Sequence, residues 1–83
     1  MRTQELTEIL QRILPGSEVL VVDMTGTMDH FRVQVVSELF EGKSRVDRHK
    51  MVFDPLQQYF ASNEIHALTL KAYTPAQWQE LQS

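Results

Sequence analysis

The fold is decided by residues 19–36, VLVVDMTGTMDHFRVQVV, in which two apolar segments flank a short turn. The first segment, Val19 to Met24, is an apolar run rich in β-branched residues and has the length of a strand. Residues 25–29 predict a turn, because Gly26 adopts positive φ angles at little cost. From Phe31 onward, buried-type and polar side chains alternate, as in a strand with one buried face. The stretch therefore predicts a β-hairpin with one face in the core.

A helix is predicted before this hairpin. Apolar side chains recur at helical spacing within residues 3–14, and Pro15-Gly16 ends the segment. Another helix is predicted after it, because Ser44 can act as its N-cap with Asp47 at the capping-box position. The apolar side of that helix is expected to consist of Val46, Met51, Val52 and Phe53.

The remaining segment predicts a helix, a strand and a final helix. Proline fits the first position of a helix, so Asp54-Pro55 starts a helix that ends at Ser62-Asn63. Residues 65–73 are predicted as a third strand, and Thr74-Pro75 caps a last short helix. The apolar side chains of these two helices are Leu56, Tyr59 and Phe60 in the first, and Trp78 and Leu81 in the second.

The predicted order is α-β-β-α-α-β-α within a single domain, residues 1–83. This order predicts an α+β fold with a three-stranded sheet, because a lone sheet must cover its apolar face with helices. Helices join the second strand to the third, which permits parallel pairing between these two strands.

The charge of the chain is unevenly distributed. Eight Lys and Arg stand against eleven Asp and Glu, yet residues 42–51 carry a net charge of +3 and the remainder −6. Clustered cations on an acidic body indicate a local recognition surface for phosphate or carboxylate, with a merely solvated helix face as the alternative. This candidate nucleic-acid or partner surface consists of Lys43, Arg45, Arg48, His49 and Lys50.

Composition and motifs argue against several classes of protein. The chain has no cysteine, and it has neither an apolar run of membrane-spanning length nor the apolar core of a secretion signal, so we expect a cytoplasmic protein that contacts no membrane. Gly42-Lys43-Ser44 imitates the end of a phosphate-binding loop, but Ser37 stands where its first glycine belongs. No nucleophile or acid–base pair stands at recognisable spacing. We therefore predict that the chain is not an enzyme.

Three histidines are the only titratable side chains able to act as metal ligands at neutral pH without special tuning, but none belongs to an HExxH motif or a CxxC pair, so no self-contained metal site is expected. His30 lies at the junction of turn and strand, and His66 begins the third strand on the same face as Leu68 and Leu70. His49 lies on the cationic helix. The structural alternatives are a half-buried His66 bonded to backbone, an exposed turn residue for His30, and a solvated helix face for His49.

Several short motifs occur in a characteristic order. They are His30-Phe31-Arg32-Val33, Val35-Val36-Ser37, Phe40-Glu41-Gly42-Lys43-Ser44, Arg48-His49, Ile65-His66-Ala67-Leu68 and Tyr73-Thr74-Pro75-Ala76-Gln77-Trp78. Together they extend over about residues 5–80, and the chain resembles the BolA-like family, in particular its members with a short loop before the second strand. The resemblance implies a fold related to the class II KH domain.

The resemblance also implies a partner and a cofactor. BolA-like proteins pair with a monothiol glutaredoxin that carries a CGFS motif, and the pair shares a 2Fe–2S cluster with glutathione. No cluster is then expected on the isolated chain. The isolated chain is expected to be a monomer or a weak homodimer. His66 matches the family's ligand position. The usual position of the second ligand is occupied by Thr27, which cannot replace imidazole, so His30 is the nearby substitute. The implied role is iron–sulfur cluster trafficking or iron regulation.

Two other functions remain open. Some BolA-like proteins are associated with transcriptional control and stress response, which implies DNA binding through the basic helix 43–50. Residues 41–44 lack the second glycine of the GxxG loop that KH domains use on single strands. The third hypothesis is a plain protein-interaction module whose histidines bind nothing.

Overall fold

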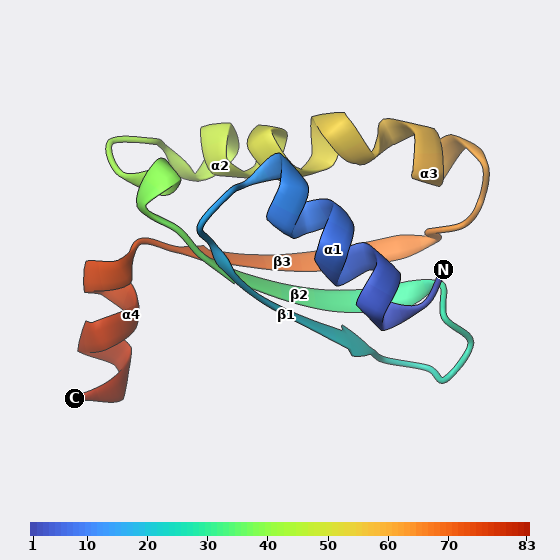
Figure 1. The fold of residues 1–83 in the computed structure, drawn as a ribbon, viewed down its shortest axis with the longest axis horizontal. Coiled ribbons are helices and arrows are strands. Elements are labelled where there is room, and N and C mark those ends of the chain that lie inside the picture. Colours follow the sequence, from blue (N-terminus) through green and yellow to red (C-terminus); the bar gives the residue numbers. More distant parts are fainter.

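The hairpin predicted from residues 19–36 forms two of the three strands of a sheet. The structure is a computed structural model that describes residues 1–83, and Figure 1 shows its ribbon. The order predicted from the sequence is confirmed. Its elements are α1 (Thr3–Ile13), β1 (Glu18–Asp23), β2 (His30–Val36), α2 (Arg45–Phe53), α3 (Gln57–Ala61), β3 (Ala67–Tyr73) and α4 (Pro75–Gln82).

The middle strand of the sheet is β2, in the order β1-β2-β3. β1 pairs with it antiparallel, with Val21 opposite Val33, and β3 pairs with it parallel, with Leu70 opposite Val33. The parallel pairing predicted from the helical connection is thus confirmed. Because β2 and β3 run in the same direction, both begin at the same end of the sheet, where His30 lies opposite Ala67.

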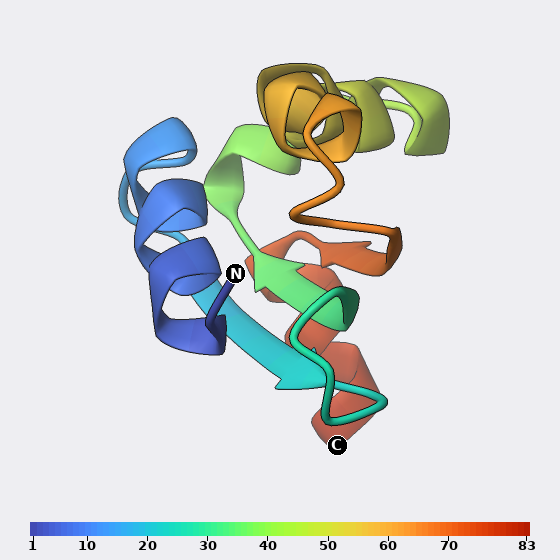
Figure 2. The same cartoon turned by 90° about the vertical axis from the view of Figure 1, so that its right-hand side faces the viewer.

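The core lies between one face of the sheet and the helices α1, α2 and α3, which cover that face (Figure 2). The alternation in β2 works as predicted, because Phe31, Val33 and Val35 are buried while Arg32 is exposed. The fully buried large side chains are Phe31, Phe40, Leu6, Leu10, Leu56, Ile65, Val33, Val35 and Val52. No helix of the structure combines the length and apolar character needed to cross a membrane.

The apolar side of α2 is narrower than predicted. Val52 is fully buried and Met51 and Phe53 are partly buried, but Val46 is 63% exposed. The placement of Val46 on the apolar side was therefore wrong. Val46 belongs to the first turn of α2, and only the second half of the helix packs against the core.

Three local boundaries also differ from the prediction. A 3-10 turn over Glu38–Phe40 follows β2, and the segment after Asp54 forms a 3-10 turn, Asp54–Leu56, before α3. The third strand begins at Ala67 rather than at residue 65. The N–H of Ile65 donates to the carbonyl of Tyr59, 3.1 Å away, and this bond draws Ile65 toward α3 and out of the strand.

The final helix, α4, extends to the other side of the sheet from α1–α3 (Figures 1 and 2). Its predicted N-cap is confirmed: the Thr74 hydroxyl accepts the N–H of Gln77, and the Gln77 side chain accepts the N–H of Thr74. The Trp78 ring packs against Tyr73 at a centroid distance of 5.6 Å. Leu81 is 62% exposed.

Replacing Ser44 with alanine should destabilise the fold by about 1 kcal/mol, as is typical for the loss of an N-cap. The Ser44 hydroxyl accepts the N–H of Asp47 over 3.1 Å, and Ser44 is exposed, so the substitution removes this bond without opening a cavity. Chemical denaturation measures the change. Ser44→Gly is the matched control and should cost only a few tenths of a kcal/mol. An equal loss in both variants would contradict the capping role.

Candidate metal centre

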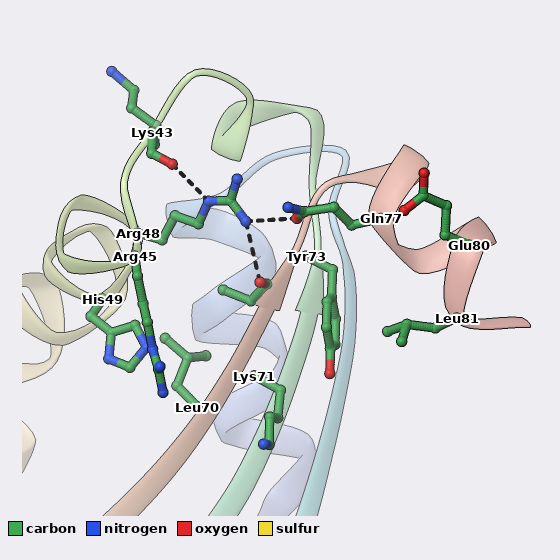
Figure 3. Close-up of a pocket in the computed structure, with 11 residues that line it drawn as sticks. Lys43, Arg45, Arg48, His49, Leu70, Lys71, Tyr73, Gln77, Glu80 and Leu81 are labelled. Carbon is green, nitrogen blue, oxygen red and sulfur yellow. Dashed lines mark hydrogen bonds between the residues drawn. The ribbon is translucent and has the colours of Figure 1, made fainter.

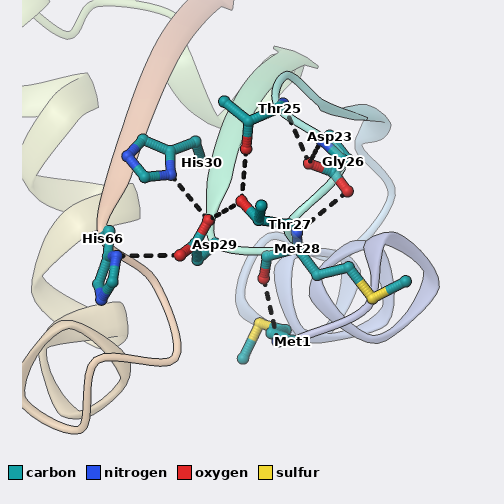
Figure 4. A network of polar contacts seen from close by, with 9 residues as sticks. All are labelled: Met1, Asp23, Thr25, Gly26, Thr27, Met28, Asp29, His30 and His66. Atoms are coloured by element: carbon teal, nitrogen blue, oxygen red, sulfur yellow. Dashed lines mark hydrogen bonds and ion pairs between the residues drawn. The ribbon is translucent and has the colours of Figure 1, made fainter.

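Two imidazole rings flank the carboxylate of Asp29, the residue just before β2 (Figure 4). His30 Nδ1 lies 2.7 Å from Asp29 Oδ1, and His66 Nδ1 lies 2.9 Å from Asp29 Oδ2. The Thr27 hydroxyl donates a further hydrogen bond to Oδ1. One carboxylate thus contacts both histidines that the sequence predicted as metal ligands.

The backbone of Asp29 fixes the same arrangement. Its carbonyl accepts the N–H of His66 over 2.8 Å and that of Ala67 over 3.2 Å. These bonds tie the entry of β3 to the entry of β2, as the parallel register requires. Backbone hydrogen bonds and strand pairing therefore fix the main chain at both histidines.

The turn between β1 and β2 wraps around a second carboxylate, that of Asp23 (Figure 4). Its two oxygens accept backbone N–H groups, from Gly26 over 3.0 Å and from Met28 over 3.1 Å. Gly26 has φ +77°, as its place in the turn predicted, and Met28 adopts the left-handed region at φ +60°. The carboxylate of Asp23 thus holds in place the turn that delivers Asp29 and His30.

The environment of Asp29 stabilises its ionised form. The hydrogen bond from Thr27 lowers the pKa of Asp29 most, followed by the hydrogen bond with His30; partial desolvation opposes them, and the charges of His30 and His66 add to the lowering. Because the pKa in the folded protein lies below that in the unfolded chain, the stability from this carboxylate is present at neutral pH. It is lost as the pH falls through the folded-state pKa.

Thr27→Val should raise the pKa of Asp29 toward its ordinary value, because the variant removes the hydrogen bond that lowers the pKa most. A carbon-detected NMR titration of the Asp29 carboxyl measures this change. Thr69→Val, an exposed substitution in β3, is the matched control and should leave the titration unchanged. A titration curve for Thr27→Val that coincides with that of the wild type would contradict this explanation.

The Nε2 atoms of the two imidazoles remain available for a metal. A carboxylate close to Nδ1 favours the tautomer that carries its proton there, which leaves the Nε2 lone pair free. The side chain of His30 is 43% exposed and that of His66 is 48% exposed, so an external partner can reach both rings. Their centroids lie 5.7 Å apart, and Asp29, His30 and His66 each place one ligand atom within 4.8 Å of the others.

Part of this site is not evident from the sequence. His66 is predicted to begin the third strand on the face of Leu68 and Leu70, but it precedes β3, is exposed, and contacts the Asp29 carboxylate through Nδ1. Asp29 was not assigned a role, and no histidine–carboxylate pair was recognised, although Asp29 adjoins His30 in the sequence. Its contact with His66 depends on the register between β2 and β3, which places His30 opposite Ala67.

The predicted basic surface lies at the other end of β3, beside a cavity of about 740 Å³ (Figure 3). Lys43, Arg45, Arg48 and His49 line this cavity, whereas Lys50 lies outside it. The His49 ring also stacks on Phe53 at 5.9 Å. The two groups of site residues predicted from the sequence therefore form two separate regions of the molecule.

Arg48 is held by three acceptors from three parts of the chain. Its Nε donates to the carbonyl of Lys43 over 3.1 Å, and its Nη1 donates to Gln77 Oε1 over 2.8 Å and, more weakly, to the Ala72 carbonyl over 3.4 Å. The guanidinium also lies 5.9 Å from the centroid of the Phe40 ring. Arg48 therefore joins the start of α2 to β3 and α4, in addition to contributing charge to the surface.

The structure is thus a small α+β domain in which one carboxylate contacts two solvent-accessible histidines. The chain belongs to the BolA family: the family model described as BolA-like protein matches residues 7–77. The resemblance seen in the sequence is thereby confirmed.

Several known proteins are similar to this chain over nearly its whole length. The acid stress protein IbaG of Escherichia coli strain K12 is 45% identical over 78 residues, which cover 94% of this chain and 89% of that protein. BolA1 from Arabidopsis thaliana superposes with a TM-score of 0.81 at 31% identity, covering 92% of this chain and 94% of that one. Yeast Fra2 gives a TM-score of 0.77 at 30% identity, covering 98% and 87%. The three-stranded α+β fold predicted from the sequence is therefore the fold of this family.

Proposed function

We propose that this chain is a non-enzymatic adaptor that binds a monothiol CGFS glutaredoxin and supplies imidazole ligands to a 2Fe–2S cluster shared with glutathione. The observation that carries the proposal is the pair His30 and His66, held through their Nδ1 atoms by Asp29. Membership of the BolA family and the resemblance of the His66 motif support it.

The donor set fits such a cluster. Neutral imidazole is an established iron ligand in 2Fe–2S centres, and the chain has no cysteine, so thiolate ligands must come from the partner and glutathione. His66 is the principal ligand in this proposal, and His30 is the auxiliary one. Imidazole ligation raises the reduction potential of a 2Fe–2S centre relative to thiolate alone.

Asp29 contributes as a positioning residue. Its carboxylate favours, for each neutral ring, the tautomer with the proton on Nδ1, which leaves the lone pair of Nε2 free for coordination. Its lowered pKa keeps the carboxylate ionised at neutral pH and below. The turn centred on Asp23 and the backbone bonds at Asp29 limit the freedom of both rings.

Mixing this protein with a cluster-loaded CGFS glutaredoxin and glutathione tests the proposal. The visible circular dichroism spectrum should change to that of a new cluster environment, and the titration should saturate at a fixed ratio of the two proteins. A spectrum equal to the sum of the separate components would overturn the proposal.

A DNA-binding regulator is the second candidate function. The observation that favours it is that no carboxylate forms a salt bridge with Lys43, Arg45 or Lys50, because the only ion pairs in the structure involve Asp29. Affinity for duplex DNA would fall with salt at a log–log slope of about −0.9 per phosphate contacted. Binding that survives Arg45→Glu with Lys50→Glu would exclude this surface. Arg48 is unsuitable for such a test, because its replacement also breaks the contacts to Lys43 and Gln77.

A further inference from the structure

The cavity at the C-terminal end of β3 is lined by more cationic residues than anionic ones. Four cationic residues line it, Lys43, Arg45, Arg48 and Lys71, against the single acidic residue Glu80. None of the four forms a salt bridge, since the ion pairs of the molecule are confined to Asp29 and its two histidines. The residues that line the cavity thus carry an excess of three positive charges, in a chain whose net charge is −3. Such a cavity attracts a multiply charged anion.

Arg48 is the fixed cation among the four. Its Nε and Nη1 atoms are bonded to Lys43, Ala72 and Gln77, which hold the guanidinium in one orientation. None of these hydrogen bonds uses Nη2, so that atom retains its donors for a ligand. A guanidinium held in this way loses little freedom when it binds an anionic oxygen, which favours affinity.

The size and the walls of the cavity indicate what the anion is attached to. Its volume of about 740 Å³ lies within the range of small-molecule sites. Beside the cations stand the apolar side chains of Leu70, Ala72, Tyr73 and Leu81 (Figure 3). A diphosphate group carries a charge of about −3 at neutral pH and so matches the excess of the cavity. The apolar side chains could then contact a flat ring joined to it.

We propose that this cavity binds a nucleoside diphosphate or an organic phosphate of similar size. The phosphates lie against Arg45, Arg48 and Lys71, and the organic part lies against Tyr73 and Leu81. β3 separates the cavity from the histidine pair, because His66 precedes the first residue of the strand and Tyr73 is its last. The proposal is therefore independent of any iron bound at His66.

Isothermal titration calorimetry of the full chain with ADP, without added metal ions, tests the proposal. Saturable binding is expected, with an affinity reduced about threefold to tenfold in Lys71→Gln and in Arg45→Gln. Both side chains are exposed and form no hydrogen bond in the fold, so these variants should fold normally. Lys50→Gln removes the same charge from α2 outside the cavity and should change the affinity by less than about twofold.

Glu80→Gln provides a test in the opposite direction. It removes the only carboxylate of the cavity and should tighten ADP binding about twofold to fivefold, an effect that general destabilisation cannot produce. Pyrophosphate should bind more weakly than ADP, because it lacks the part that contacts the apolar side chains.

Three outcomes would overturn the proposal. The first is no saturable binding of ADP at millimolar concentration, and the second is an unchanged affinity in Lys71→Gln and Arg45→Gln. The third is saturable binding of a single-stranded oligonucleotide by the same residues in the absence of any ADP binding, which would assign the cavity to nucleic acid. Equal affinities for pyrophosphate and ADP would overturn the role assigned to Tyr73 and Leu81.

Discussion

Replacing His66 with alanine should abolish the new visible circular dichroism signal that forms with a cluster-loaded CGFS glutaredoxin. His66 is the proposed principal ligand, and without it His30 is the one imidazole left at the site, while Thr27 cannot replace imidazole on iron. The His66 side chain is 48% exposed, so its removal opens no cavity in the core. The backbone N–H of residue 66 can still donate to the Asp29 carbonyl, and we therefore expect a thermal unfolding curve close to that of the wild type.

His49→Ala is the matched control for this experiment. It also removes an imidazole, but from α2, beside the cavity at the other end of β3. The cluster spectrum of this variant should equal that of the wild type. A wild-type spectrum in His66→Ala would contradict the ligand assignment, whereas loss of the spectrum in both variants would show that the measurement reports the partner interface.

Asp29→Asn should weaken formation of the shared cluster by about 10–100-fold, the usual cost of removing a group that orients a metal ligand. An amide can accept a hydrogen bond only through its oxygen, so it cannot hold both Nδ1 protons of His30 and His66 as the carboxylate does. Part of each histidine population should then carry its proton on Nε2, where it blocks coordination.

Imidazole nitrogen shifts, measured by NMR on the protein alone, distinguish this role from a structural one. In the wild type the Nδ1-protonated tautomer should predominate for both rings, and in Asp29→Asn the Nε2-protonated tautomer should increase. Asp47→Asn, an equal change of charge at an exposed position of α2, should alter neither the tautomers nor the cluster titration. Unchanged tautomers in Asp29→Asn would contradict the positioning role while leaving the ligand assignment of His66 intact.

The fold could be predicted from local signals, because the burial of one strand face and the capping of a helix each leave a pattern within a few residues of the sequence. The alternation from Phe31 to Val35 marks the buried face of β2, and the caps at Ser44 and Thr74 mark the starts of α2 and α4. Local signals gave a wrong prediction where packing between elements determines whether a side chain is buried. Val46 satisfies the apolar pattern of a helix, but it lies in a first turn that makes no contact with the core.

The candidate site could be predicted only in part, because its central residue depends on a distant pairing. The ligating potential of His30 and His66 follows from residue type and motif alone. The role of Asp29 requires the exact parallel register of β2 and β3, which brings together residues 37 positions apart in the sequence. Similarly, Lys71 and Gln77 join the basic segment in one cavity only after β3 and α4 have packed beside α2.

The backbone bonds from Asp29 to His66 and Ala67 have a kinetic consequence. These bonds fix the main chain that carries the two proposed ligands, so the proposed partner need not wait for a loop to close or a strand to form. Association should then proceed in one phase, with an observed rate proportional to partner concentration and limited by collision and orientation. A plateau in that rate at high concentration would reveal an opening step before capture, in spite of these backbone bonds.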